Sequence, residues 1–260
     1  MRRSILAVLA VSGLCAAVSL GGSAQAQGNE RLRWLGGDLP PFVWQSSNGP
    51  QGYAHELLTL MAQKLGRKPD VAFYPWARAV KQTMEGDTYG VFPLARTPDR
   101  EAQFRWLIPL AHVHYSFFAA SSTTGPLGLE QLRTQKIVVL RGSPIIKNLQ
   151  AQGFTQIIEA KDYRDMLRMV SIGVVVAAYA GAPMMQSAMQ EFGFKASDYK
   201  LVATLGNADL YMGTSLRLDL GEAQLWIEAY RTLEQDGIVA RLQKKYQLSR
   251  AGGHMSGNGE

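Results

Sequence analysis

The sequence alternates short apolar runs with amphipathic stretches of helical period along almost its whole length. Such alternation is typical of α/β layers and argues against an all-β sandwich or a helical bundle. We expect strands at residues 32–35, 71–74, 91–95, 115–120, 137–140, 156–159, 174–179 and 201–205. We expect helices at residues 54–65, 76–85, 144–152, 163–172, 183–192, 222–234 and 238–246. The alternation restarts after residues 123–126, so the sequence predicts two α/β lobes joined by crossing strands, with a cleft between them.

The first 26 residues have the three parts of a secretory signal peptide. Arg2 and Arg3 come first, an apolar stretch follows at residues 5–20, and small residues close the segment at 24–26. We expect cleavage after Ala26 and a periplasmic location. The alternative is a permanent membrane anchor, but the apolar stretch is near the lower end of the roughly 17 to 25 residues needed to span a bilayer.

Composition excludes several functional classes. Hydrophobic residues make up 47% and charged residues 18% of the 260, as in soluble globular proteins. Removal of Arg2 and Arg3 lowers the formal net charge from +6 to +4, and no basic run occurs, so we expect no nucleic-acid partner. The single cysteine, Cys15, lies in the predicted signal peptide, which excludes a disulfide framework and a cysteine-rich metal site.

Residues 95–101 form the most informative segment. Thr97 is a good N-cap and Pro98 suits the first helical position, which would place Arg100 in the first turn of a helix. A cation is poorly placed at that end of the helix dipole unless an anion binds there. One interpretation is therefore a carboxylate receptor made by Arg100 and backbone N–H groups. The other is a surface arginine neutralised by Asp99 and Glu101, and the pattern alone does not decide between them.

Several short segments occur in an order that is hard to obtain by chance: residues 40–42, 52–58, 96–101, 104–106, 139–143, 233–237 and 244–246. Together they resemble family 3 extracellular solute-binding proteins, the periplasmic receptors of polar amino-acid ABC importers. The resemblance implies an α/β chain with the type II periplasmic-binding-protein fold. We expect lobe 1 at residues 27–119 and 208–250, lobe 2 at 120–207, and a disordered tail at 251–260.

The resemblance also implies roles for individual residues. Arg100 would grip the ligand carboxylate, Trp76 would pack on the ligand, Phe42 would lie in a loop that supplies a further wall, and Ser143 would contribute a hydroxyl. The residue pattern agrees at Ser143, because Ser143 followed by Pro144 is a good cap and first-turn pair. A helix cap without any ligand explains the same pair equally well.

Two departures from the family pattern bear on the ligand. Residues 173–181 contain no carboxylate where amino-acid receptors usually carry one for the ligand ammonium, and Pro93 and Ala95 replace the usual hydroxyl residues. A buried ammonium without a counter-charge is costly, so we expect an anionic or carboxylate-bearing solute instead. The basic and aromatic residues predicted around the cleft are Arg78, Arg96, Arg100, Arg141, Trp44, Trp76 and Tyr179. Arg78 could equally be a solvated helix residue, and Trp76 a core residue.

The leading hypothesis is a monomeric, non-enzymatic receptor that closes on its ligand and presents it to an ABC permease. An enzyme on the same fold, acting on cyclic carboxylates as a dehydratase, would need an acid or base such as Glu56, Asp38 or His55. A ligand-sensing module for a membrane receptor is the third alternative. We expect no cofactor and no metal, because His112 and His114 share a strand face but lack further ligands.

Overall fold

The structure, a computed structural model, describes residues 31–251. The predicted signal peptide and residues 252–260 of the predicted tail lie outside the described residues. Ala251 is described and is buried, with 8% of its surface exposed. Within residues 31–251, no helix has the length and apolar content needed to cross a membrane.

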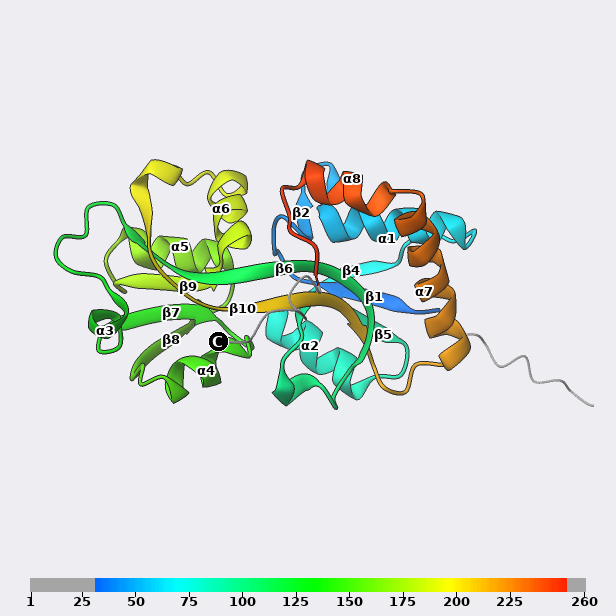
Figure 1. Cartoon of the computed structure of the whole chain (residues 1–260), viewed down its shortest axis with the longest axis horizontal. Helices are drawn as coiled ribbons and strands as arrows, with labels where there is room; N and C mark the ends of the chain where they lie inside the picture. The colour runs from blue at the N-terminus through cyan, green and yellow to red at the C-terminus, as the bar shows by residue number, and fades with distance from the viewer. Residues whose placement is uncertain (1–30, 252–260) are drawn as a thin grey trace, which may run out of the picture. The chain divides into compact units, whose positions relative to one another are not determined.

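One mixed sheet organises the chain (Figure 1). Its eight strands lie in the order β4-β1-β5-β10-β6-β9-β7-β8, and β2 and β3 form a separate hairpin. The strands are β1 (Arg33–Gly36), β2 (Trp44–Ser46), β3 (Gly49–Gln51), β4 (Val71–Phe73), β5 (Tyr89–Ala95), β6 (Arg105–Ala120), β7 (Lys136–Leu140), β8 (Gln156–Ala160), β9 (Ala177–Gly181) and β10 (Tyr199–Thr214).

The two longest strands, β6 and β10, join the two ends of the sheet. Each has 16 residues, and the two pair antiparallel along almost their full length. At one end β10 carries β5, which leads to the parallel strands β1 and β4. At the other end β6 carries β9, which leads to the parallel strands β7 and β8. The sheet therefore has a β1/β4 side and a β7/β8 side connected through two continuous strands.

The helices cover both faces of the sheet (Figure 1). They are α1 (Tyr53–Lys64), α2 (Trp76–Glu85), α3 (Leu129–Leu132), α4 (Ile145–Ala151), α5 (Tyr163–Ser171), α6 (Ala182–Glu191), α7 (Leu220–Gln235) and α8 (Ile238–Lys245), with single 3₁₀ turns η1 (Pro98–Arg100) and η2 (Ala196–Asp198). On the β1/β4 side, α1 and α8 lie across one face of the sheet and α2 across the other (Figure 1). The remaining short helices, α3 to α6, surround the β7/β8 side.

Aromatic side chains fill the core at each end. On the β1/β4 side, Trp34 is fully buried and meets Phe92 and Trp226 edge-on, with ring centroids 5.8 and 5.7 Å apart. On the β7/β8 side, Phe117 stacks on Phe154 at 5.3 Å. Such contacts add to the stabilisation from apolar burial and hold each end of the sheet as a packed unit.

The sequence predicts most elements to within two or three residues, and α2 matches its predicted bounds. The strand expected at 174–179 is wrong in its bounds, because β9 begins only at Ala177. The backbone N–H groups of Val174 and Val175 both donate to the carbonyl of Met169, so these residues complete the end of α5 rather than start the strand.

The expected strands at 115–120 and 201–205 are fragments of the long strands β6 and β10. The strand expected to end at residue 205 continues through Gly206. The register of β10 against β6 shifts between Thr204 and Asn207, and Gly206 takes a φ of 79° there. A bulge of this kind lets the strand continue with a bend.

Candidate functional site

Two adjoining cavities lie where the connections after β1, β4, β7 and β8 meet. In both pairs of parallel strands these connections leave the carboxyl ends, which is where α/β sheets place ligands. The smaller, inner cavity has a volume of about 30 Å³ and the outer one about 290 Å³. Leu39, Trp76 and Leu140 line both cavities and form the neck between them.

Arg100 dominates the inner cavity. Only 7% of its surface is exposed, its Nη2 donates a hydrogen bond of 2.8 Å to the carbonyl of Gly142, and its Nη1 is buried without a hydrogen-bond partner. Burial lowers the pKa of Arg100 to about 10, and the nearby Tyr115 opposes this lowering only in part. Arg100 therefore stays charged at neutral pH, and no Asp or Glu of the described residues lines this cavity. A buried cation with an unused donor is suited to bind an anion.

The surroundings of Arg100 correct one expectation. The segment is a single 3₁₀ turn, Pro98–Arg100, and not the first turn of an α-helix. Thr97 occupies the cap position, but its hydroxyl makes no cap hydrogen bond and is buried without a partner. The attraction for an anion therefore comes from the guanidinium group itself and not from the dipole of an α-helix that begins at Arg100.

Three tyrosines line the β7/β8 part of the inner cavity: Tyr115, Tyr163 and Tyr179. Burial raises the pKa of Tyr115 to about 12 and raises the pKa values of Tyr163 and Tyr179 above the usual tyrosine range. All three are therefore neutral at neutral pH. The Tyr163 hydroxyl donates to Sδ of Met184 at 3.5 Å, and the Tyr179 hydroxyl donates to the carbonyl of Leu205.

Trp76 and Ser143 complete the predicted residues found at the inner cavity. Trp76 is the first residue of α2 and is 6% exposed, so it is a core residue that also contributes a wall. Ser143 is half-buried, and its hydroxyl has no hydrogen-bond partner within residues 31–251. Ser143 does not cap α4, because that helix starts at Ile145 with Pro144 in the cap position.

The other five predicted residues lie outside both cavities. Trp44 is buried in β2. Phe42 is fully buried and packs edge-on against Tyr53. Arg78 lies over the ring of Tyr74, and the exposed Arg141 is 3.9 Å from the carboxylate of Glu159.

The Arg96 side chain also contacts residues outside both cavities. Its guanidinium forms two hydrogen bonds to Glu101, at 2.9 and 2.5 Å, and lies over the rings of Trp106 and Tyr211. The hydrogen bonds that Arg96 donates to Glu101 raise the pKa of Arg96. Of the two interpretations offered for the segment, local neutralisation describes Arg96, whereas Arg100 has no acidic partner of this kind.

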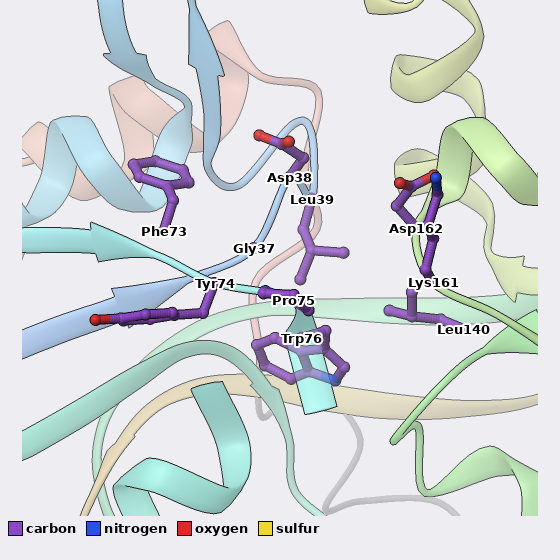
Figure 2. Close-up of a pocket in the computed structure, with 10 residues that line it drawn as sticks. All are labelled: Gly37, Asp38, Leu39, Phe73, Tyr74, Pro75, Trp76, Leu140, Lys161 and Asp162. Atoms are coloured by element: carbon purple, nitrogen blue, oxygen red, sulfur yellow. The ribbon is translucent and has the colours of Figure 1, made fainter. Parts of the chain in front are cut away.

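The outer cavity brings together charged residues that sequence reasoning did not combine (Figure 2). Asp38 lies on the loop after β1, whereas Lys161 and Asp162 lie across the opening, between β8 and α5 (Figure 2). Asp162 caps α5 by accepting from the N–H of Asp165 at 2.7 Å, and Asp38 accepts from the N–H of Gln45 at 2.9 Å. The β7/β8 side thus does supply a carboxylate, although at the outer cavity and not near residues 173–181.

A cue for Asp162 was present in the sequence. An aspartate directly after a predicted strand and before an amphipathic helix is both an N-cap and a residue at the carboxyl end of the sheet. The aromatic residues Phe73 and Tyr74 also line the outer cavity. They could have been predicted there because they lie at the carboxyl end of β4.

Of the residues considered for catalysis, Asp38 lines the outer cavity, whereas Glu56 and His55 line neither cavity. Glu56 accepts from Nζ of Lys245 at 2.6 Å and from the hydroxyl of Tyr246 at 3.0 Å, away from both cavities. Burial lowers the pKa of the adjacent His55. His112 lies 2.7 Å from Asp209, and residues 31–251 contain no cluster of three or more side chains that could hold a metal ion.

Comparison with known proteins decides the family. The sequence profile of the bacterial extracellular solute-binding proteins, family 3, matches residues 35–249. The chain belongs to this family. The resemblance found in the motifs is thereby confirmed, and so is the type II periplasmic-binding-protein fold.

Two solved structures and one curated relative are similar to this solute-binding protein. A histidine kinase sensor domain with similarity to periplasmic binding proteins superposes with a TM-score of 0.77 at 20% identity, covering 85% of this chain and 99% of that one. An ABC uptake transporter substrate-binding protein from Streptococcus pneumoniae with bound histidine gives a TM-score of 0.73 at 13% identity, covering 82% and 91%.

The curated relative is membrane-bound lytic murein transglycosylase F of Ectopseudomonas mendocina (strain ymp). It is 25% identical over 160 residues, which are 58% of this chain. The match spans only 33% of the length of the transglycosylase.

Proposed function

We propose that this solute-binding protein captures a small carboxylate-bearing solute at Arg100. The observation that carries the proposal is a guanidinium with 7% exposure, one buried donor without a partner, and no acidic residue of the described chain in its cavity. Burying a charge in this way is costly unless something pairs with it. A ligand carboxylate supplies that partner and forms a charge-assisted hydrogen bond with the donor that is free.

Binding would proceed by closure of two lobes, residues 27–119 with 208–250 and residues 120–207. Arg100 follows β5 on one side, whereas Ser143, Tyr163 and Tyr179 come from the other, so a ligand between them contacts both lobes only when these are shut. The energy of those contacts shifts the population to the closed form. The inner cavity of about 30 Å³ fits a closed form, which must open before a ligand can enter.

The proposed role is delivery of the solute to an ABC importer from the periplasm. The family supports this role, as does the likeness to the Streptococcus pneumoniae transporter receptor. The signal pattern of residues 1–26 supports export.

A ligand screen tests the proposal. Thermal unfolding of the protein without residues 1–26 is measured with a panel of carboxylates and amino acids, followed by calorimetric titration of those that stabilise it. We expect at least one carboxylate to raise the melting temperature, and Arg100→Gln to weaken its binding about 100-fold or more. Arg78→Gln is the matched control, since Arg78 is exposed and outside both cavities. Equal binding by the Arg100→Gln variant and the wild-type protein contradicts the proposal.

A sensor role is the second candidate, favoured by the likeness to the histidine kinase sensor domain. It uses the same ligand site and differs only in the partner. Capture of membrane proteins on the liganded and ligand-free forms distinguishes the two, because a permease and a kinase receptor are identified directly by mass spectrometry.

A further inference from the structure

We propose that the ligand is a separated zwitterion, with its carboxylate on Arg100 in the inner cavity and its ammonium group beside Asp162 in the outer cavity. This inference rests on the proposed function and names the class of solute. The class is the unbranched ω-amino acids, in which a methylene chain separates the two charges, and not the α-amino acids.

The inner cavity is unsuited to an ammonium group. In an α-amino acid the ammonium is two bonds from the carboxylate carbon, so it would lie in the same cavity as Arg100. The only charge lining that cavity among the described residues is the guanidinium itself, which repels a second cation. The hydroxyls of Tyr163 and Tyr179 are neutral and already donate to Met184 and Leu205. An ammonium there would be desolvated without a counter-charge.

The outer cavity offers the missing counter-charge. Asp162 is half-buried, and its cap hydrogen bond to Asp165 uses one carboxylate oxygen and fixes the orientation of the side chain. Figure 2 shows this carboxylate beside the gap that separates it from Leu39 and Asp38. Asp38 adds a second negative charge and the exposed Lys161 one positive charge, so the lining carries a net charge of −1. None of the three forms an ion pair within the part of the chain that the structure describes.

The neck between the cavities determines what can join the two charged ends. It consists of the buried apolar residues Leu39, Trp76 and Leu140, with exposures of 2%, 6% and 6%. A methylene chain gains from burial against these side chains. A peptide group there would lose hydrogen bonds to water without replacement, so the neck favours an ω-amino acid over a dipeptide.

A length series with matched analogues tests the proposal. The probes are γ-aminobutyrate, δ-aminovalerate and ε-aminocaproate, with valerate as the analogue lacking the ammonium, norvaline as the α-amino isomer, and glutarate as the dicarboxylate. We expect one ω-amino acid to bind about tenfold or more tightly than valerate, norvaline or glutarate, from one charge-assisted hydrogen bond.

Asp162→Asn is the decisive variant, because asparagine caps helices as well as aspartate does and the fold is retained. We expect it to remove the advantage of the ω-amino acid while leaving valerate affinity unchanged. Asp219→Asn is the matched control: Asp219 caps α7 in the same manner, accepting from the N–H of Glu222 at 2.9 Å, but lies outside both cavities. It should change neither affinity.

The possible results distinguish failure of the zwitterion proposal from failure of the proposed function. Tightest binding of norvaline, glutarate or valerate, lost in Arg100→Gln, overturns the separated zwitterion and leaves the proposed function standing. Tight binding of an ω-amino acid that survives Asp162→Asn overturns the assignment of Asp162. Absence of binding by every carboxylate overturns both.

Discussion

Gly142 lies so close to Ala77 that a Cβ placed on it would come within 2.8 Å of the Ala77 Cβ. Gly142 follows β7 and Ala77 belongs to α2, so this contact joins the β7/β8 side to the β1/β4 side. The carbonyl of the same glycine accepts the hydrogen bond from Arg100. Contact between the two sides at the inner cavity therefore requires a residue without a side chain at position 142.

Gly142→Ala should consequently weaken ligand binding by hindering closure. The added methyl group meets backbone and side-chain atoms of Ala77, at 2.9 and 2.8 Å, that cannot move independently of α2. We expect affinity to fall about tenfold or more, an order of magnitude consistent with about 1 to 3 kcal/mol for overpacking. Calorimetric titration measures the affinity, and small-angle scattering shows whether the ligand still compacts the protein.

Gly173→Ala separates steric hindrance from backbone strain. Gly173 has a φ of 71°, close to the 77° of Gly142, but a Cβ there meets nothing within 4 Å. Both variants should lose about 1 kcal/mol of unfolding free energy from the left-handed conformation. Only Gly142→Ala should lose affinity, and an equal loss in Gly173→Ala would show that strain alone is responsible.

Arg100→Met should abolish carboxylate binding without destabilising the ligand-free protein. The lowering of the pKa of Arg100 from 12.5 to about 10 corresponds to about 3 kcal/mol of unfavourable burial, at about 1.4 kcal/mol per tenfold change. Loss of the hydrogen bond to Gly142 offsets about 1 kcal/mol of the gain. Urea unfolding should therefore show equal or higher stability, by up to about 2 kcal/mol, and a clear loss would assign Arg100 a structural role instead.

Carboxylate affinity should be level through neutral pH and fall above about pH 10. Arg100 binds the anion only when protonated, and burial has lowered its pKa in the free protein to about 10. A bound carboxylate favours the protonated form, so above that pH binding takes up a proton and weakens as pH rises. Titrations across this range measure the decline. In Arg100→Lys the same burial acts on an ordinary pKa of about 10.4, so the decline should begin at lower pH.

Local pattern was sufficient for the longer helices, but not for the four-residue helix α3 or for the ends of the long strands. The 3.6-residue period predicted α2 at its observed bounds, because one face of that helix packs on the sheet. The predicted strand bounds missed residues 105–114 of β6, of which only His112 and His114 were assigned to a strand face. The partners of this stretch on β10 lie about a hundred residues away. The start of β9 was predicted too early, because Val174 and Val175, which precede the strand, hydrogen-bond backwards to Met169 of α5. Long-range pairing and helix ends compete with local propensity at such positions.

The same distinction explains the site. Arg100, Trp76, Ser143 and Tyr179 reach the inner cavity, and the sequence had marked each of them as a candidate site residue. Arg141 does not, because Glu159 on the neighbouring strand holds it outside. The local sequence alone could not distinguish Arg141 from Arg100, since both are single arginines after a strand. The decisive difference is burial without a partner, which depends on packing across the whole sheet.

Glu222→Gln should lower stability without altering ligand affinity. Glu222 is 6% exposed, accepts from Nη1 of Arg67 at 2.5 Å and from Nε1 of Trp226 at 2.9 Å, and lines neither cavity. The glutamine retains an acceptor for Trp226 but leaves the charge of Arg67 uncompensated, which should cost about 2 kcal/mol of unfolding free energy. Urea unfolding and titration with the same ligand measure the two effects separately. A clear fall in ligand affinity would contradict this prediction and would link α7 to the cleft.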